Sequence, residues 1–289
     1  MESFSKFLKW LMFKRYPNLY RPSQNTYISY DSYRNLSKHI FDESKTFNPK
    51  NVKNSDIVFV NGLFLDNFLK TNHLKIDRNY KLLLCGENFE INEENSEKLK
   101  SKKIIHIFSN NLKIANSNFF TFLPLGIKDK RFLKSGNFKE YHKYKKEKNS
   151  NILSVNNRYM PPLNDIFDLN TEKINSNYIT HVDPENYKDF YKIVSRHKFI
   201  LFSNELLNDS NIFWESIMLD CFPIIKMNNF TEKLLKLNVP ALYVKSIEEV
   251  EKFDNIFLEK TYLKLKIKQA KNKFLFINYW KNLINGEKE

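Results

Sequence analysis

Short apolar runs alternate with polar or helical segments along the first half of the chain. Four of these runs have the length of strands, at residues 56–60, 80–85, 103–108 and 119–127. The first three end at polar residues or glycine, and the last contains Pro124 and Gly126. The segment 63–70 has a helical pattern. Short buried strands separated by such segments are typical of a parallel α/β sheet, so we expect one here.

The same alternation returns in the second half of the chain. Strand-like runs occupy residues 151–155, 177–182, 198–203 and 241–244, and residues 187–197 and 262–284 have helical patterns. A charged, polar stretch at 135–151 is the best linker between the two halves. We therefore predict an α/β fold with two Rossmann-like domains. The first spans 1–145 and the second 146–262, and a helical tail follows at 263–289.

Polar residues follow the first set of strands where a ligand would be expected. In parallel α/β sheets, ligands gather at the carboxyl ends of the strands. Glu87 and Asn88 follow the strand 80–85, and Ser109 and Asn110 follow the strand 103–108. This edge of the sheet is therefore a candidate ligand-binding edge.

Residues 211–225, NIFWESIMLDCFPII, predict a helix, a turn and a strand. Asn208 to Asn211 are good N-cap types, so we expect a helix over 212–219. Asp220 would take a left-handed C-terminal position. Residues 221–223 would turn the chain into a buried strand at Ile224 and Ile225.

The start of this predicted helix would lie just past the end of the strand 198–203. Free backbone N–H groups and the positive end of the helix dipole suit a phosphate there. Glu215, one turn into the helix, is placed to accept hydrogen bonds from a ribose diol. Two α/β domains with such a site suggest a nucleotide-sugar enzyme with its active site in the cleft between them.

The charge of the chain allows two interpretations. The 289 residues carry a formal net charge of +14, which favours a polyanionic partner. Compositional drift explains it equally well, because Lys, Asn, Ile and Phe are abundant and only 5 residues are glycine. No zinc-finger cysteines or aromatic-glycine signature accompanies the charge, so no nucleic-acid partner is expected.

Residues 1–15 have an amphipathic helical pattern with lysines on its polar side. This helix would lie on an anionic membrane surface or pack on its own domain. Cys85 and Cys221 lack the spacing of a metal site or a disulfide framework, so we expect reduced thiols in the cytoplasm.

The stretch KFILFSNELLNDSNIFWESIMLDCFPII, residues 198–225, resembles the signature of the exostosin-like glycosyltransferases. Similarity extends thinly over residues 55–285, including NYWKNLI at 278–284. The matching positions are Lys198, Phe199, Ser203, Trp214, Glu215, Cys221 and Pro223. This resemblance implies a GT-B-like fold, in which two Rossmann-like domains face each other across a cleft. It also implies transfer of a sugar from a nucleotide-sugar donor with inversion at the sugar carbon.

The chain departs from the family pattern at two positions. Ile212 replaces the arginine two residues before the tryptophan, and Asp220 replaces the glycine before the cysteine. The lost arginine matters because a diphosphate needs a cation nearby. Arg158, which follows the first strand of the second domain, is the first choice to replace it, and Lys198 and Arg196 are alternatives.

Eight residues form the predicted nucleotide-sugar site: Asn156, Arg158, Lys198, Ser203, Asn204, Asn211, Trp214 and Glu215. Five of them have a simpler interpretation. Trp214 would pack in the core, and Glu215 would be a solvated helix residue. Lys198 would be a plain strand-edge lysine, and Asn204 and Asn211 would be loop or capping residues.

The catalytic base is expected from the first domain, since inversion needs one base for the acceptor hydroxyl. Glu87 is our candidate, and a surface glutamate in a loop is the alternative. His106 and Glu90 are weaker choices, and Asp56 is weaker still because it opens its strand. The sequence has no Asp-x-Asp motif and no histidine pair with metal-ligand spacing. We therefore expect no metal and no cofactor beyond the donor.

These observations favour a glycosyltransferase of cell-surface polysaccharide synthesis. Its acceptor would be a glycan or a lipid-linked glycan, and it would work in the cytoplasm, peripheral to the inner membrane face. Two rivals remain. One is a non-catalytic protein that binds nucleic acid or an anionic membrane, and the other is a nucleotide-sugar-binding pseudoenzyme.

Overall fold

Two compact units make up the chain in the computed structural model. Unit 1 contains Met1–Leu125 and Leu275–Glu289, and unit 2 contains Gly126–Phe274. The chain therefore leaves unit 1 once and returns to it for its last residues. The structure describes residues 26–42, 47–86, 89–128, 141, 143–144, 148, 150–155, 178–182, 187–202 and 209–287.

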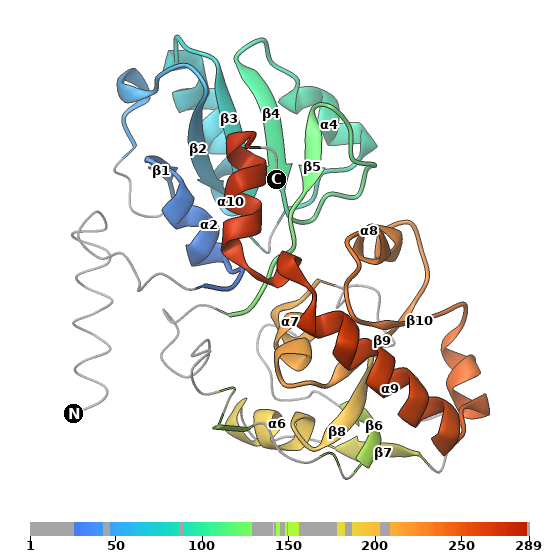
Figure 1. Ribbon diagram of the computed structural model, residues 1–289. Helices are drawn as coiled ribbons and strands as arrows, with labels where there is room; N and C mark the ends of the chain where they lie inside the picture. Colours follow the sequence, from blue (N-terminus) through green and yellow to red (C-terminus); the bar gives the residue numbers. More distant parts are fainter. Residues whose placement is uncertain are drawn as a thin grey trace. The chain divides into compact units, whose positions relative to one another are not determined.

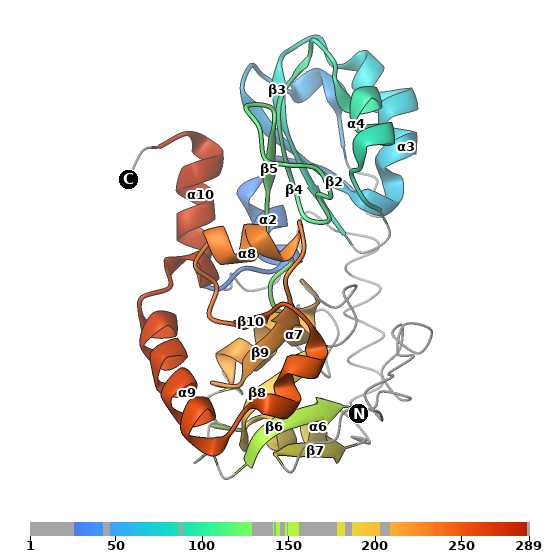
Figure 2. The same cartoon turned by 90° about the vertical axis from the view of Figure 1, so that its right-hand side faces the viewer.

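Unit 1 is built on a five-stranded parallel sheet whose strands follow their order in the sequence (Figure 1). The strands are β1 (His39–Phe41), β2 (Asp56–Asn61), β3 (Tyr80–Cys85), β4 (Ile104–Ser109) and β5 (Phe120–Phe122). Each strand of this sheet is followed by the strand beside it, always in the same direction across the sheet. Because such crossovers are right-handed, their connecting segments all lie on one face of the sheet. The short α3 (Leu65–Asn67) and α4 (Glu93–Leu99) lie on that face (Figure 2).

The opposite face of this sheet is covered by α2 (Tyr30–Leu36) and α10 (Ile277–Asn285) (Figure 2). Trp280 and Ile284 of α10 are buried, and the Lys81 Nζ of β3 donates to the Ile284 carbonyl at 2.6 Å. The Ile28 N–H donates to the Leu275 carbonyl at 3.1 Å. The last residues of the chain thus complete the fold of its first part.

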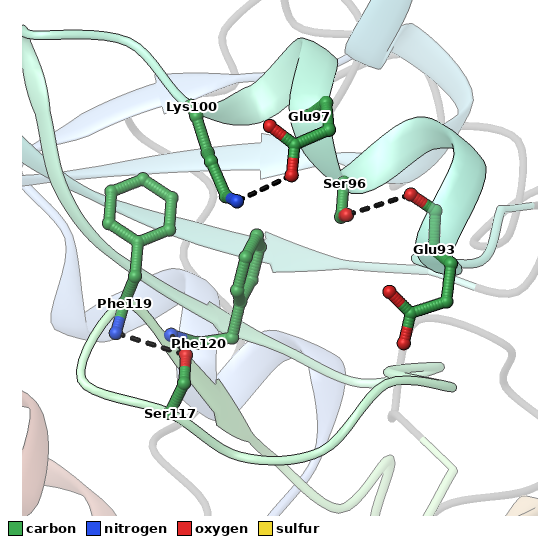
Figure 3. Close-up of polar contacts among 7 residues, drawn as sticks. All are labelled: Glu93, Ser96, Glu97, Lys100, Ser117, Phe119 and Phe120. Atoms are coloured by element: carbon green, nitrogen blue, oxygen red, sulfur yellow. Dashed lines mark hydrogen bonds and ion pairs between the residues drawn. The ribbon is translucent and has the colours of Figure 1, made fainter.

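Local hydrogen bonds fix the ends of α4 and the entry to β5 (Figure 3). The side chains of Asn92 and Asn95 form a reciprocal capping box at the start of α4. Before β5, the Ser117 Oγ accepts from the N–H groups of Phe119 and Phe120, at 3.2 and 3.1 Å. These bonds satisfy backbone groups that neither the helix nor the sheet pairs.

Unit 2 has a second parallel sheet of five strands with a different order, β10-β9-β8-β6-β7. The strands are β6 (Ser150–Val155), β7 (Ile179–Val182), β8 (His197–Phe202), β9 (Phe222–Lys226) and β10 (Leu242–Val244). Numbered by sequence within the unit, they lie in the doubly wound order 2-1-3-4-5. The direction of winding therefore reverses between β6 and β8.

Helices of unit 2 pack on both faces of its sheet. Leu258, Tyr262 and Leu265 of α9 (Asn255–Ala270) share a core with Phe199 and Leu201 of β8. Phe202, which alternates to the other face, has its ring 5.7 Å from that of Phe213 in α7 (Asn211–Met218). The other α-helices described in the unit are α6 (Tyr187–Val194) and α8 (Thr231–Lys236), and a 3-10 helix spans Ile247–Lys252.

The α/β class and the two parallel sheets confirm the coarse prediction of the fold, while the boundaries lie elsewhere. The chain enters unit 2 at Gly126 rather than near 146, and α9, which spans the predicted 262/263 boundary, belongs to unit 2. Tyr141, inside the predicted linker, is buried. β9 begins at Phe222, so Pro223 lies in the strand, and pairing with β10 begins only at Ile224.

Candidate functional site

The carboxyl ends of β6 and β8 are neighbours at the point where the winding of the unit 2 sheet reverses. Open α/β sheets bind their ligands outside the carboxyl ends at such a switch point. In the sequence, Asn156 and Arg158 follow β6, and Ser203 and Asn204 follow β8. These four predicted residues, and Glu87 of unit 1, lie outside the described residues.

Helix α7 follows β8 in the sequence and is buried from its second residue onward. Its N-cap is Ser210, whose side chain accepts from the Phe213 N–H at 3.3 Å. Every residue from Ile212 to Met218 is buried. Asp220, just past the helix, has a φ of 56°, which confirms the left-handed conformation expected there. The helix begins one residue before the predicted start.

Glu215 is the polar centre of this helix and is 0% exposed. Its Oε1 accepts from the Lys128 backbone N–H at 3.1 Å and from the Tyr141 hydroxyl at 2.9 Å. Its Oε2 accepts from the Tyr191 hydroxyl at 3.1 Å. Burial raises the pKa of the Glu215 carboxyl above its usual value, and the three hydrogen bonds act in the opposite direction.

Asn211 lies one turn before Glu215 and contacts the same segment of unit 2. The Asn211 Nδ2 donates to the Gly126 carbonyl at 2.7 Å, two residues before the Lys128 N–H that Glu215 binds. Residues four apart share one face of a helix. Asn211 and Glu215 together therefore fix residues 126–128 against α7.

This placement bears on the roles predicted for Asn211 and Glu215. Both oxygens of Glu215 are already bound by protein donors. Because the carboxylate is 0% exposed, a ribose hydroxyl could reach it only after neighbouring side chains moved, so the ribose contact stays a prediction. The solvated alternative for Glu215 is wrong, because the side chain is fully buried.

Trp214 is a core residue rather than a wall of a ligand site. It is buried, its ring centroid lies 5.1 Å from that of Phe213, and its Nε1 donates to the Asp209 Oδ1 at 2.7 Å. An indole nitrogen needs such an acceptor when it leaves water. The packing interpretation therefore replaces the predicted ligand contact.

Lys198 lies at the opposite edge of the sheet from the switch point. It is the second residue of β8, close to the amino end of that strand. Its Nζ forms an ion pair with Glu259 of α9 and donates to the Asn151 Oδ1 at 3.1 Å. Arg196 precedes β8 at the same edge and is exposed. We therefore correct the prediction that Lys198 joins the nucleotide-sugar site, and exclude Arg196 too.

In unit 1, the carboxyl ends of β3 and β4 are joined through Asn110. Its Nδ2 donates to the Gly86 carbonyl at 2.7 Å and its Oδ1 accepts from the Gly86 N–H at 3.1 Å. Asn111 adds a bond from its Nδ2 to the same carbonyl at 3.2 Å. Ser109 and Asn110 are buried. Asn110 and Asn111 therefore hold the Gly86 backbone at this edge of the sheet.

The weaker base candidates have structural partners of their own. His106 lies within β4, where its Nδ1 is 3.1 Å from the Asn118 carbonyl and its Nε2 is 2.9 Å from the Thr121 Oγ1. Glu90 accepts from the Asn92 Nδ2 at 3.2 Å. Asp56 opens β2, as expected, and its Oδ2 lies 2.7 Å from the His39 Nε2. His106 and Asp56 do not lie at the carboxyl edge beside Asn110. Glu90 stays near that edge, because the N–H of the next residue, Ile91, donates to the Asn111 carbonyl at 3.0 Å.

Three residues of this buried network were not predicted from the sequence: Tyr141, Tyr191 and Asp209. Tyr191 had a detectable signal, because α6 is amphipathic and this tyrosine lies on its buried side. Tyr141 stands in a lysine-rich stretch that resembles a solvated linker. Asp209 resembled one more loop residue before a helix.

The described residues contain no group of three His, Cys, Asp or Glu side chains that could hold a metal ion. Among the same residues, no helix is both long enough and apolar enough to cross a membrane. Cys85 and Cys221 are both buried, and burial raises the pKa of the Cys221 thiol to about 12. No family model matches the sequence, and a search of the curated proteins gives no significant match.

Proposed function

We propose that the protein is a glycosyltransferase that uses a nucleotide-sugar donor, with a GT-B-like arrangement of its two units. The observation that carries the proposal is the switch point of unit 2. The strands that meet there, β6 and β8, are followed in the sequence by Asn156 and Arg158 and by Ser203 and Asn204. A cation and several amides and hydroxyls are the groups that a nucleoside diphosphate requires.

The proposed roles follow from chemistry and from position. Arg158 binds the diphosphate and stabilises the charge that develops on it as the bond to the sugar breaks. Asn156, Ser203 and Asn204 bind the donor by hydrogen bonds, and the first turn of α7 contributes its dipole. Asn211 and Glu215 hold residues 126–128 in place beside that turn.

Glu87 is the proposed base for the acceptor. It follows Gly86, whose backbone is bound by Asn110 at the carboxyl edge of the unit 1 sheet. In the proposed cleft, the carboxylate takes the proton of the acceptor hydroxyl while that oxygen bonds to the anomeric carbon. The nucleoside diphosphate leaves from the opposite side, which inverts the centre. The proposal uses no metal, and its acceptor is a glycan or lipid-linked glycan at the cytoplasmic membrane face.

A thermal-shift panel tests the donor site directly. The full chain is melted with UDP, GDP, CMP, dTDP and their sugars, without added metal. A ligand at a hundred times its Kd stabilises the folded state by about 2.7 kcal/mol, which corresponds to several degrees for a chain of this size. We expect one nucleotide to shift the melting temperature and Arg158→Ala to abolish that shift.

Arg196→Ala is the matched control, because it removes the same charge from the amino edge of the same sheet. A shift that both variants lose equally would point to overall charge rather than to the switch point. Flat traces for the whole panel would overturn the donor site. A nucleotide that binds without turnover of its sugar would identify a pseudoenzyme instead.

A further inference from the structure

Helix α9 presents a row of aliphatic side chains to solvent. Ile256, Leu263 and Ile267 are 65%, 58% and 61% exposed. They are spaced at i, i+7 and i+11, so they share one side of the helix. The buried Leu258, Tyr262 and Leu265 pack on the unit 2 sheet from the opposite side of α9. Figure 1 shows α9 in the lower part of the picture, where the strands of unit 2 are drawn. The row is therefore not an extension of the core.

Lysines outnumber acidic residues around this row. Lys260, Lys264 and Lys271 are exposed along the same side of the helix. The only acidic residue from Asn255 to Lys271 is Glu259, and its carboxylate pairs with Lys198. Two further lysines of α9, Lys266 and Lys268, lie over the rings of Tyr262 and Tyr243. The outward side thus combines aliphatic side chains with unbalanced positive charge.

We propose that this side of α9, defined by Ile256, Lys260, Leu263, Lys264, Ile267 and Lys271, docks on an anionic lipid surface. An interfacial helix buries aliphatic side chains at the boundary between headgroups and acyl chains, while lysines along its flank bind the acidic headgroups. Long lysine stems extend past buried methyl groups and keep their ammonium groups in water. This inference is independent of the proposed donor site and of residues 1–15.

The composition of the row argues against the other anionic partners. Phosphate backbones are bound by cations and polar groups, and single-stranded bases stack on aromatic rings. The centre of this row is aliphatic, so it would leave three apolar side chains without a counterpart on a nucleic acid. Binding to a lipid surface instead buries those side chains and neutralises the three lysines together.

Vesicle sedimentation of the full chain tests the proposal. Vesicles of phosphatidylcholine with about a third phosphatidylserine are compared with vesicles of phosphatidylcholine alone. We expect binding to the anionic vesicles only, weaker at higher salt because exposed charges are screened. The triple variant Ile256→Gln, Leu263→Gln, Ile267→Gln should bind at least about tenfold more weakly. Each of Lys260→Gln, Lys264→Gln and Lys271→Gln should weaken binding about fivefold.

The matched control changes three other exposed leucines to glutamine, Leu63, Leu74 and Leu235, which are 61%, 66% and 43% exposed. This control should bind as the unchanged protein does, and melting curves verify that every variant is folded. Unchanged binding of the α9 triple variant would overturn the proposal. Absence of binding to both kinds of vesicle would also overturn it. A third contrary result would be an α9 triple variant that loses self-association in sedimentation velocity but still binds vesicles.

Discussion

The hydroxyl of Tyr141 donates to the carboxylate of Glu215 at 2.9 Å, across 74 residues of sequence. The carboxylate is fully buried and also accepts from Tyr191 and from the Lys128 N–H. A buried carboxylate is tolerated only where such donors replace water. The fold around α7 therefore depends on a tyrosine from a stretch that otherwise consists largely of lysine and polar residues.

Removal of this hydroxyl should destabilise the fold. Tyr141→Phe leaves a buried carboxylate with one donor fewer, which costs about 1.5–3 kcal/mol for a bond to a charged group. Urea unfolding measures the change. Tyr144→Phe is the control, because its ring lies 5.9 Å from that of Tyr191 and no hydrogen bond from its hydroxyl to the described residues is observed. Equal losses from the two variants would contradict the role given to the Tyr141 hydroxyl.

Acid should weaken the folded state between pH 7.5 and 5.5. Burial lowers the pKa of His73, His106 and His197 below 6.5. As the pH falls, the unfolded chain therefore binds more protons than the folded chain. Stability is therefore full above pH 6.5 and falls as the pH drops toward the lowered values. We expect a loss of about 1–2 kcal/mol over this range, measured by urea unfolding at each pH.

A histidine variant isolates part of this effect. The His197 Nδ1 donates to the Ile193 carbonyl at 2.8 Å, and its buried Nε2 has no hydrogen-bond partner among the described residues. His197→Asn places an amide nitrogen near Nδ1 and removes the titration, so the slope with pH should become shallower. His181 is exposed, and His181→Asn is the control for a histidine outside the core. A larger change in the pH slope from His181→Asn than from His197→Asn would refute this explanation.

Gly86 should be intolerant of a side chain. Its φ is +151°, and an added Cβ would lie 3.2 Å from both the Asn61 Oδ1 and the Gly62 backbone nitrogen. Gly86→Ala should therefore cost more than the ~1–2 kcal/mol of backbone strain alone. Gly286, with a φ of +81° and nothing within 4 Å of an added Cβ, is the comparison. Thermal melts in which Gly286→Ala is the more damaging change would contradict this account.

Asp220→Gly should stabilise the protein. Asp220 has a φ of 56° just past α7. Glycine adopts this left-handed conformation without steric strain. The gain should be about 0.5–1 kcal/mol, visible as a higher melting temperature. Asn238, also with a φ of 56°, follows α8. Asn238→Gly should gain less, because asparagine tolerates this conformation better. A lower melting temperature for Asp220→Gly would show that its carboxylate matters more than its backbone.

The strands could be predicted where the chain carries a long apolar run with a clear stop. The run 80–85 ends at Gly86 and became β3 with the same bounds. β1 was missed because it has only three residues, His39–Phe41, of which only Ile40 is buried. β9 was predicted two residues late, because Pro223 resembles a turn residue. The strand accommodates it, since β10 pairs only from Ile224 onward.

The direction of the side chains around α7 could not be predicted. Its residues from Ile212 to Met218 are buried on every side, so no apolar stripe distinguishes an inward face from an outward one. The partners of Glu215 and Trp214 are Tyr141, Tyr191 and Asp209. Tyr141 and Tyr191 are separated from α7 in the sequence by intervening elements, so only tertiary folding brings them to Glu215.

The return of the chain to unit 1 has a consequence for synthesis on the ribosome. The residues of unit 1 up to Leu125 emerge before unit 2, and α10, which covers their sheet and binds Lys81, emerges after it. Nascent chains lengthen by roughly 5–20 residues per second, so the first sheet waits roughly 8–30 s without that helix. Unit 2 can fold from a contiguous segment in the meantime. A chaperone that binds exposed apolar surface would therefore find a persistent target on the face that Trp280 later covers.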